Sequence, residues 1–167
     1  MALQVHLVRH AESVHNQAQQ LIQSFPDAPK VGAINTSPLK RAIQTTLAGF
    51  SHILDKRYFD TKSGQGIENG ATLILDPNLQ ERSALPCDTG SGSEDLDQAF
   101  PKLVKEGFYS PADEAVKERA KRATSRSSAV SEGLKNQKRT HIVVVTYGVF
   151  MKFLSRDSEI DLLKAGW

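Results

Sequence analysis

The residues best suited to chemistry lie near the start of the chain, in the adjacent pair Arg9 and His10. They follow a short apolar run, Val5 to Val8, whose alternation and branched side chains are typical of a buried strand. Arginine offers a planar set of N–H donors that matches the oxygens of a phosphate group. Histidine has an unprotonated ring nitrogen near physiological pH and can act as a nucleophile. The pair therefore indicates phosphoryl chemistry at the end of a strand.

A second arginine, Arg41, lies in a segment with clear signals for the start of a helix. Val31 to Asn35 has the composition of another buried strand, and Ser37 and Pro38 then suit the cap and the first position of a helix. Arg41 would lie in the first turn, beside the positive end of the helix dipole, where an anion is favoured. Apolar residues recur at helical spacing as far as Phe50, so one face of this helix is expected to pack on the core.

The elements that must position these residues are strands that alternate with helices. The clearest buried strand runs from His141 to Thr146 and leads into Tyr147 and a helical segment, Val149 to Leu154. A further strand is expected from Thr72 to Leu75. Such alternation, without hairpin signals, predicts an α/β fold with a parallel sheet flanked by helices. Ligands bind beyond the carboxyl ends of the strands in such sheets, so we expect Arg9, His10 and Arg41 to converge there.

Two motifs in this order resemble a known family. The run Arg9 to Ser13 (Arg-His-Ala-Glu-Ser), with Asn16 three positions further on, resembles the Arg-His-Gly signature of the histidine phosphatase superfamily, in its phosphoglycerate mutase-like branch 1. The run Ser37 to Thr46 resembles the second arginine motif of that family. The resemblance implies a three-layer α/β/α sandwich with a mostly parallel central sheet, and phosphoryl transfer through a phosphohistidine. We expect one such domain over residues 1–167.

The family resemblance also assigns roles to individual residues. It implies that His10 attacks phosphorus, while Arg9 and Arg41 hold the phosphate oxygens. Asn16 would add a further hydrogen-bond donor to the phosphate. Glu81, which follows the third expected strand, would protonate the leaving oxygen. These roles suit the reaction, because positioned cations and donors stabilise the charge on a transferring phosphoryl group and an alkoxide needs a proton.

One position departs from the family pattern. The strand that ends at Thr146 is followed in the family by a second catalytic histidine and a glycine, whereas this chain has Tyr147 and Gly148. The histidine is a charged donor to the phosphoryl oxygens, and tyrosine is a neutral donor at physiological pH. Loss of one preorganised donor at a developing oxyanion costs about 10²–10³ in rate. Tyr147 therefore predicts reduced or altered activity.

Three functions stay open on the sequence alone. The first is a phosphomonoester hydrolase of reduced or narrowed activity, which the joint presence of His10, Arg9, Arg41 and Glu81 favours. The second is a non-catalytic pseudophosphatase that binds phosphorylated ligands or a protein partner. The third is an enzyme with altered, lyase- or isomerase-type chemistry, in which Tyr147 and Glu81 serve as acid and base. Mutase activity is less favoured than hydrolysis, because the extra substrate-reading residues of phosphoglycerate mutases cannot be placed here.

The resemblance implies no metal ion and no organic cofactor, and the expected partner is a small phosphorylated molecule. His6, His10 and His15 lie close together in the sequence, but their spacing matches no familiar metal-ligand signature. His52 and His141 are expected to be structural.

The composition fits a soluble domain and excludes some partners. The formal net charge of +2, from 21 basic and 19 acidic residues, is too balanced to indicate a nucleic-acid or membrane partner. The single cysteine, Cys87, excludes an intrachain disulfide and fits a reducing compartment, and no signal peptide is recognisable, so we expect a cytoplasmic protein. The family usually has a longer segment between the residues matching His10 and Arg41, which predicts missing residues between Asn16 and Gln17 and, less strongly, near Leu103.

Overall fold

The computed structural model describes residues 4–10, 25–80, 93–103, 121–125, 129 and 139–155. Its strands are β1 (Gln4–Arg9), β2 (Val31–Thr36), β3 (Thr72–Leu75) and β4 (His141–Thr146). Each strand agrees within one residue at either end with the strand expected from the apolar runs. β2 and β4 are buried along their whole length, as expected for the central strands of a sheet covered on both faces.

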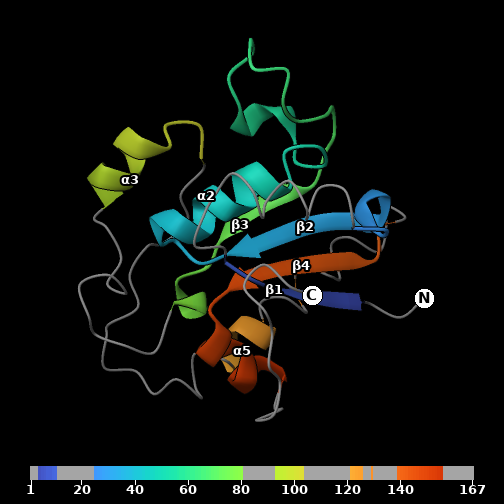
Figure 1. Ribbon diagram of the computed structural model, residues 1–167, viewed down its shortest axis with the longest axis vertical. Helices are drawn as coiled ribbons and strands as arrows, with labels where there is room; N and C mark the ends of the chain where they lie inside the picture. The colour runs from blue at the N-terminus through green and yellow to red at the C-terminus, as the bar shows by residue number, and fades with distance from the viewer. Residues whose placement is uncertain are drawn as a thin grey trace.

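The four strands form one sheet in the order β1-β4-β2-β3, and all three pairings are parallel. Figure 1 shows β4 between β1 and β2, although β4 comes last in the sequence. Because the strands are parallel, their carboxyl ends lie at one edge of the sheet. The segments that follow β1, β2 and β4 are therefore neighbours in space.

Helices cover both faces of the sheet. Figure 1 shows α2 (Lys40–Gly49) on one face and α5 (Gly148–Ser155) on the other. The short helix α3 (Ser93–Ala99), which the sequence analysis did not predict, contributes Leu96 to the core on the α2 side. This arrangement confirms the expected three-layer α/β/α class with its parallel sheet.

Alternating side chains of the central strands supply two separate clusters of core residues. Val143 and Val145 of β4 pack with Val8 and Phe50 on one side of the sheet. Ile142 and Val144 pack on the other side, in the cluster that contains residues of α5. Both faces of β4 are thus apolar, which explains why its sequence reads as a continuous run of branched residues.

The start of α2 differs from the prediction. Ser37 and Pro38 were expected to be its cap and first residue, but the helix begins at Lys40 and Leu39 is its cap, with an extended backbone at φ −71° and ψ 135°. The Ser37 hydroxyl accepts a hydrogen bond from the Leu39 amide at 3.4 Å, which forms a turn before the helix. Arg41 still lies in the first turn.

Several expectations fall on residues outside the described ranges. They concern the junction between Asn16 and Gln17, the residues after Leu103, and both Asn16 and Glu81 as site residues. No helix in the described part of the chain is long and apolar enough to cross a membrane. The single-domain assignment for residues 1–167 stays a prediction.

Candidate functional site

The pair Arg9 and His10 lies at the carboxyl end of β1, where the sequence placed it. Arg9 is the last residue of the strand and pairs with Thr146 of β4. The His10 amide donates to the Thr146 carbonyl at 2.9 Å, which continues the parallel ladder by one residue. Both side chains are half-buried, so the imidazole is held by the sheet without being sealed from solvent.

Tyr147 occupies the equivalent position at the end of β4. Its carbonyl accepts a hydrogen bond from the Met151 amide at 2.9 Å, so Tyr147 is the residue from which α5 starts. Its side chain is 1% exposed and belongs to the core cluster on the α5 side. The aromatic ring lies 4.5 Å from the His10 ring, centroid to centroid, with 52° between the ring planes. The phenol is therefore in direct contact with the expected nucleophile.

Arg41 reaches the same ring from the first turn of α2. The Ser37 amide donates to the Val145 carbonyl at 3.1 Å, which fixes the segment between β2 and α2 against β4. The Arg41 guanidinium carbon then lies 4.8 Å from the centroid of the Tyr147 ring, in the geometry of a cation–π contact. One aromatic ring thus contacts both the imidazole of His10 and the guanidinium of Arg41.

The Arg9 guanidinium lies against Gly148, the first residue of α5. A Cβ atom added at Gly148 would be 2.9 Å from Nε, 3.1 Å from Cζ and 3.4 Å from Cδ of Arg9. The space that a side chain would need at this position is therefore used by the guanidinium. The sequence analysis noted Gly148 beside Tyr147 but gave it no role, because its importance depends on the path of Arg9.

The described residues bring two guanidinium groups and one imidazole to the edge of the sheet where α2 and α5 begin. The amino ends of helices carry partial positive charge and attract anions. Arg41 and Arg9 add two full positive charges at the starts of these helices. The arrangement is suited to a compact, multiply charged anion, with a nucleophilic nitrogen beside it.

The segment after β3 is attached to the same edge. The Thr146 hydroxyl, which is buried, donates to the Leu79 carbonyl at 2.7 Å. Asp76 caps the turn of 3-10 helix Pro77–Leu79 that leads to this carbonyl. Glu81 comes two positions after Leu79, outside the described residues, as does Asn16.

Comparison with known proteins identifies the family. The model of the histidine phosphatase superfamily (branch 1) matches residues 55–162, which is well over half of the chain. The chain belongs to the histidine phosphatase superfamily. The matched range includes Tyr147 but begins after Arg9, His10 and Arg41, so the assignment does not depend on the two motifs that carry these residues.

Relatives of this histidine phosphatase superfamily member support the same fold. A fission yeast (Schizosaccharomyces pombe) protein named as a probable phosphatase is 26% identical over 156 residues, which cover 87% of this chain and 66% of the relative. A mycobacterial glucosyl-3-phosphoglycerate phosphatase structure superposes with a TM-score of 0.54 at 17% identity, over 92% of this chain and 78% of that one. A Bacillus anthracis phosphoglycerate mutase structure superposes with a TM-score of 0.52 at 11% identity, over 96% of this chain and 84% of that one. At these identities the two solved structures establish a shared fold.

Proposed function

We propose that this superfamily member is a phosphomonoester hydrolase that acts through a phosphohistidine at His10. The proposal is carried by one observation, the contact of the Tyr147 ring with both His10 and Arg41. Residues 31 positions apart in the sequence, from the two motifs that resemble the family, meet at the carboxyl edge of the sheet. Arg9 reaches the same edge through its packing on Gly148.

The proposed reaction is the one that the family resemblance implies, and the charges at this edge suit it. A ring nitrogen of His10 attacks phosphorus, so that a P–N bond forms and the P–O bond of the ester breaks. Arg9 and Arg41 hold the equatorial oxygens and stabilise their charge, and Asn16 adds a donor. The leaving alkoxide takes a proton from Glu81, and water then cleaves the P–N bond to release phosphate. The substrate is a small phosphorylated molecule.

Tyr147 makes this enzyme slower than relatives with a second histidine. A phenol is a neutral donor, so it stabilises a developing phosphoryl charge less than an imidazolium would. By the magnitude seen for one missing oxyanion donor, we expect a loss of about 10²–10³ in turnover.

The cation–π contact favours a second candidate function, a pseudophosphatase that binds phosphorylated ligands without cleaving them. The Tyr147 ring is 1% exposed and lies 4.8 Å from the Arg41 guanidinium carbon, so the guanidinium is shared between the ring and any bound phosphate. A guanidinium held by an aromatic ring can still bind a phosphate group. It is less able to give the additional stabilisation that the charge of the transition state requires.

Hydrolysis of an aryl phosphate by the wild-type chain and by His10→Ala separates these two functions. The hydrolase proposal expects the wild type to exceed the variant, and expects acid-labile phosphate to be trapped on the wild type and not on His10→Ala. Equal rates for the two proteins, combined with binding of vanadate or phosphate, would overturn the hydrolase and support the pseudophosphatase. Because Cys87 is the single cysteine and suits a reducing compartment, we also propose that the protein acts in the cytoplasm.

A further inference from the structure

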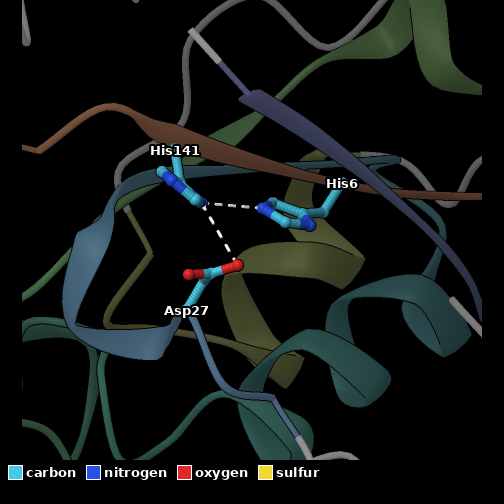
Figure 2. Close-up of side chains that lie close together, drawn as sticks. All are labelled: His6, Asp27 and His141. Atoms are coloured by element: carbon cyan, nitrogen blue, oxygen red, sulfur yellow. Dashed lines mark hydrogen bonds and ion pairs between the residues drawn. The ribbon is translucent and has the colours of Figure 1, made fainter. Parts of the chain in front are cut away.

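A second group of polar side chains lies on the same sheet, away from the edge that carries Arg9 and His10. Figure 2 shows His6 of β1, His141 of β4 and Asp27, from the turn before β2, with their side chains directed toward one another. The register pairs Gln4 with His141, so His6 lies two positions further along β1 and on the same face of the sheet as His141. Neither imidazole has a role in the proposed phosphatase reaction.

The distances within this group are short. Nε2 of His6 lies 2.8 Å from Nδ1 of His141, and Oδ2 of Asp27 lies 3.9 Å from that Nδ1. Each of the three residues offers one ligand atom, and these ligand atoms lie within 4.8 Å of one another. Two nitrogens and one carboxylate oxygen, from three separate segments, are thus aimed at one small region.

The neighbouring residues hold these side chains in place. The His6 ring packs edge-on against Phe25, at 4.9 Å between centroids and 89° between planes, and stacks on His141 at 5.0 Å. His141 is 4% exposed. The Lys30 ammonium binds Oδ1 of Asp27 at 2.8 Å, which leaves Oδ2 on the side of His141. The group is therefore preorganised, with its rotamers fixed by packing and by an ion pair.

The contact between the two imidazoles is compatible with a bound cation. At 2.8 Å, one of the two facing nitrogens donates a proton and the other accepts it with its lone pair. A tautomeric shift of the donor ring would free both lone pairs without loss of a proton to solvent.

We propose that His6, Asp27 and His141 form a binding site for a divalent transition-metal ion of the Zn²⁺ type. Two imidazole nitrogens and one carboxylate oxygen are a donor set typical of zinc and its neighbours, whereas magnesium and calcium prefer oxygen ligands alone. In a tetrahedral zinc site with Zn–N distances of about 2.0–2.1 Å, neighbouring ligand atoms are about 3.3 Å apart. The separations of 2.8 and 3.9 Å lie on either side of this value, and all ligand atoms lie within 4.8 Å of one another. Shifts of about 1.5 Å or less therefore bring the ligand atoms to the tetrahedral spacing.

The position of the site defines what the ion would do. His6 and His10 are four positions apart on an extended strand, so the two sites are separated by about 13 Å. The ion would therefore not touch a phosphate held by His10. It would instead join the turn before β2 to β1 and β4, with the fourth coordination position left for water or an external ligand. Binding to the native state alone would stabilise the fold.

The test uses the full chain without an affinity tag, stripped of metal with a chelator and titrated with Zn²⁺, with Co²⁺ as a spectroscopic probe and Mg²⁺ as a comparison. We expect one Zn²⁺ per chain, visible Co²⁺ absorption typical of nitrogen ligands, and no effect of Mg²⁺. At Zn²⁺ concentrations of about 100 times Kd, Tm should rise by roughly 5–10 °C.

Substitutions assign the ligands. Asp27→Asn changes a half-exposed turn residue and keeps the fold, and His6→Gln keeps a polar group of similar length; each should weaken Zn²⁺ binding by at least about 10-fold. The matched controls Asp60→Asn and His52→Gln remove a carboxylate and an imidazole outside the group, and should leave the affinity unchanged. His10→Ala should also bind Zn²⁺ like the wild type, which separates this site from the proposed catalytic one. No 1:1 binding by the wild type, or unchanged affinity in folded Asp27→Asn and His6→Gln, would overturn the proposal.

Discussion

Replacement of Gly148 by alanine should reduce catalysis without harming the fold. The added Cβ would be 2.9 Å from Nε and 3.1 Å from Cζ of Arg9. Among described residues beyond its chain neighbours and its own helix backbone, the three nearest atoms all belong to Arg9. The backbone φ of Gly148 is not in the left-handed region, so alanine fits the backbone there. The strain therefore falls on the end of a flexible side chain, which can move away.

The size of the effect follows from how far Arg9 must move. Non-bonded carbon and nitrogen atoms in good contact are roughly 3.5–4.0 Å apart, so the guanidinium must shift by about 0.5–1 Å. A misplacement of about 1 Å in a group that positions the substrate costs up to about 10²-fold in rate. We expect kcat/KM of Gly148→Ala to fall about 10–100-fold, which corresponds to about 1.4–2.7 kcal/mol of transition-state stabilisation. The free energy of unfolding should be unchanged or up to about 1 kcal/mol higher, because alanine is the better helix former.

The assay is aryl phosphate hydrolysis, with inhibition by inorganic phosphate as a measure of anion binding and urea unfolding as the measure of stability. Gly64→Ala is the matched control. In the described part of the chain, no atom other than its sequence neighbours lies within 4 Å of the added Cβ, but φ is +69°, so the cost is backbone strain. It should lose about 1–2 kcal/mol of stability and keep full activity per folded molecule. Values of kcat/KM within twofold of wild type for Gly148→Ala would refute the placement of Arg9 in the phosphate site.

Three further predictions follow from individual residues. Tyr147→His should raise aryl phosphate turnover by about 10-fold or more by restoring a charged donor; unchanged or lower turnover would argue that the phenol serves another chemistry. Gly70→Ala would place Cβ 2.5 Å from the Asp55 amide nitrogen, a backbone atom that cannot move away easily. We expect the free energy of unfolding, measured in urea, to fall by roughly 2–3 kcal/mol, and a near-neutral result would contradict this packing. Both ring nitrogens of His52 are buried and have no hydrogen-bond partner among the described residues, and burial lowers the pKa of His52. The unfolded chain therefore takes up this proton first, and stability should fall as pH drops below about 6.5 toward the folded-state pKa. His52→Phe should lose this part of the decrease in the free energy of unfolding at low pH, as measured by urea unfolding. A pH profile identical to that of the wild type would show that His52 does not contribute to the decrease.

The strands were predictable because each one is a short apolar run with a clear end. The run from His141 to Thr146 is buried on both faces in the structure, and this burial is what its unbroken branched residues require. The helix α3 was not predictable in the same way, because Leu96 is the one core residue among positions 94–99, whose burial is described, and a single residue gives no apolar stripe. The predicted start of α2 was wrong by two residues, because the backbone of Leu39 is extended. Pro38 suits the first position of a helix, so nothing in the sequence indicated that the helix begins later.

The two sites differ in how far the sequence reveals them. Arg9, His10 and Arg41 come from runs of neighbouring residues that resemble family motifs, so their types and order were sufficient to group them. The contact partners were not visible: the packing of Arg9 on Gly148 and of Arg41 on Tyr147 depends on side-chain paths across the sheet. His6 and His141 are 135 positions apart, and only the β1–β4 register brings them together. The prediction that His141 is structural could not take His6 into account, because the two residues are neighbours only in the folded sheet.

The parallel sheet gives a physical reason for the separation of the two sites. All strands point the same way, so the helices that follow β2 and β4 begin at one edge and concentrate positive partial charge there. An anion is favoured at that edge, and Arg9 and Arg41 strengthen the preference. His6 and His141 lie back along the strands, beyond the buried Val8. Asp27 precedes the short 3-10 helix Ala28–Lys30, and its carboxylate is paired with the Lys30 ammonium. The cation proposed there would share the Asp27 carboxylate with Lys30 but would lie far from the guanidinium groups of Arg9 and Arg41. The direction of the strands thus separates the anion site from the proposed cation site.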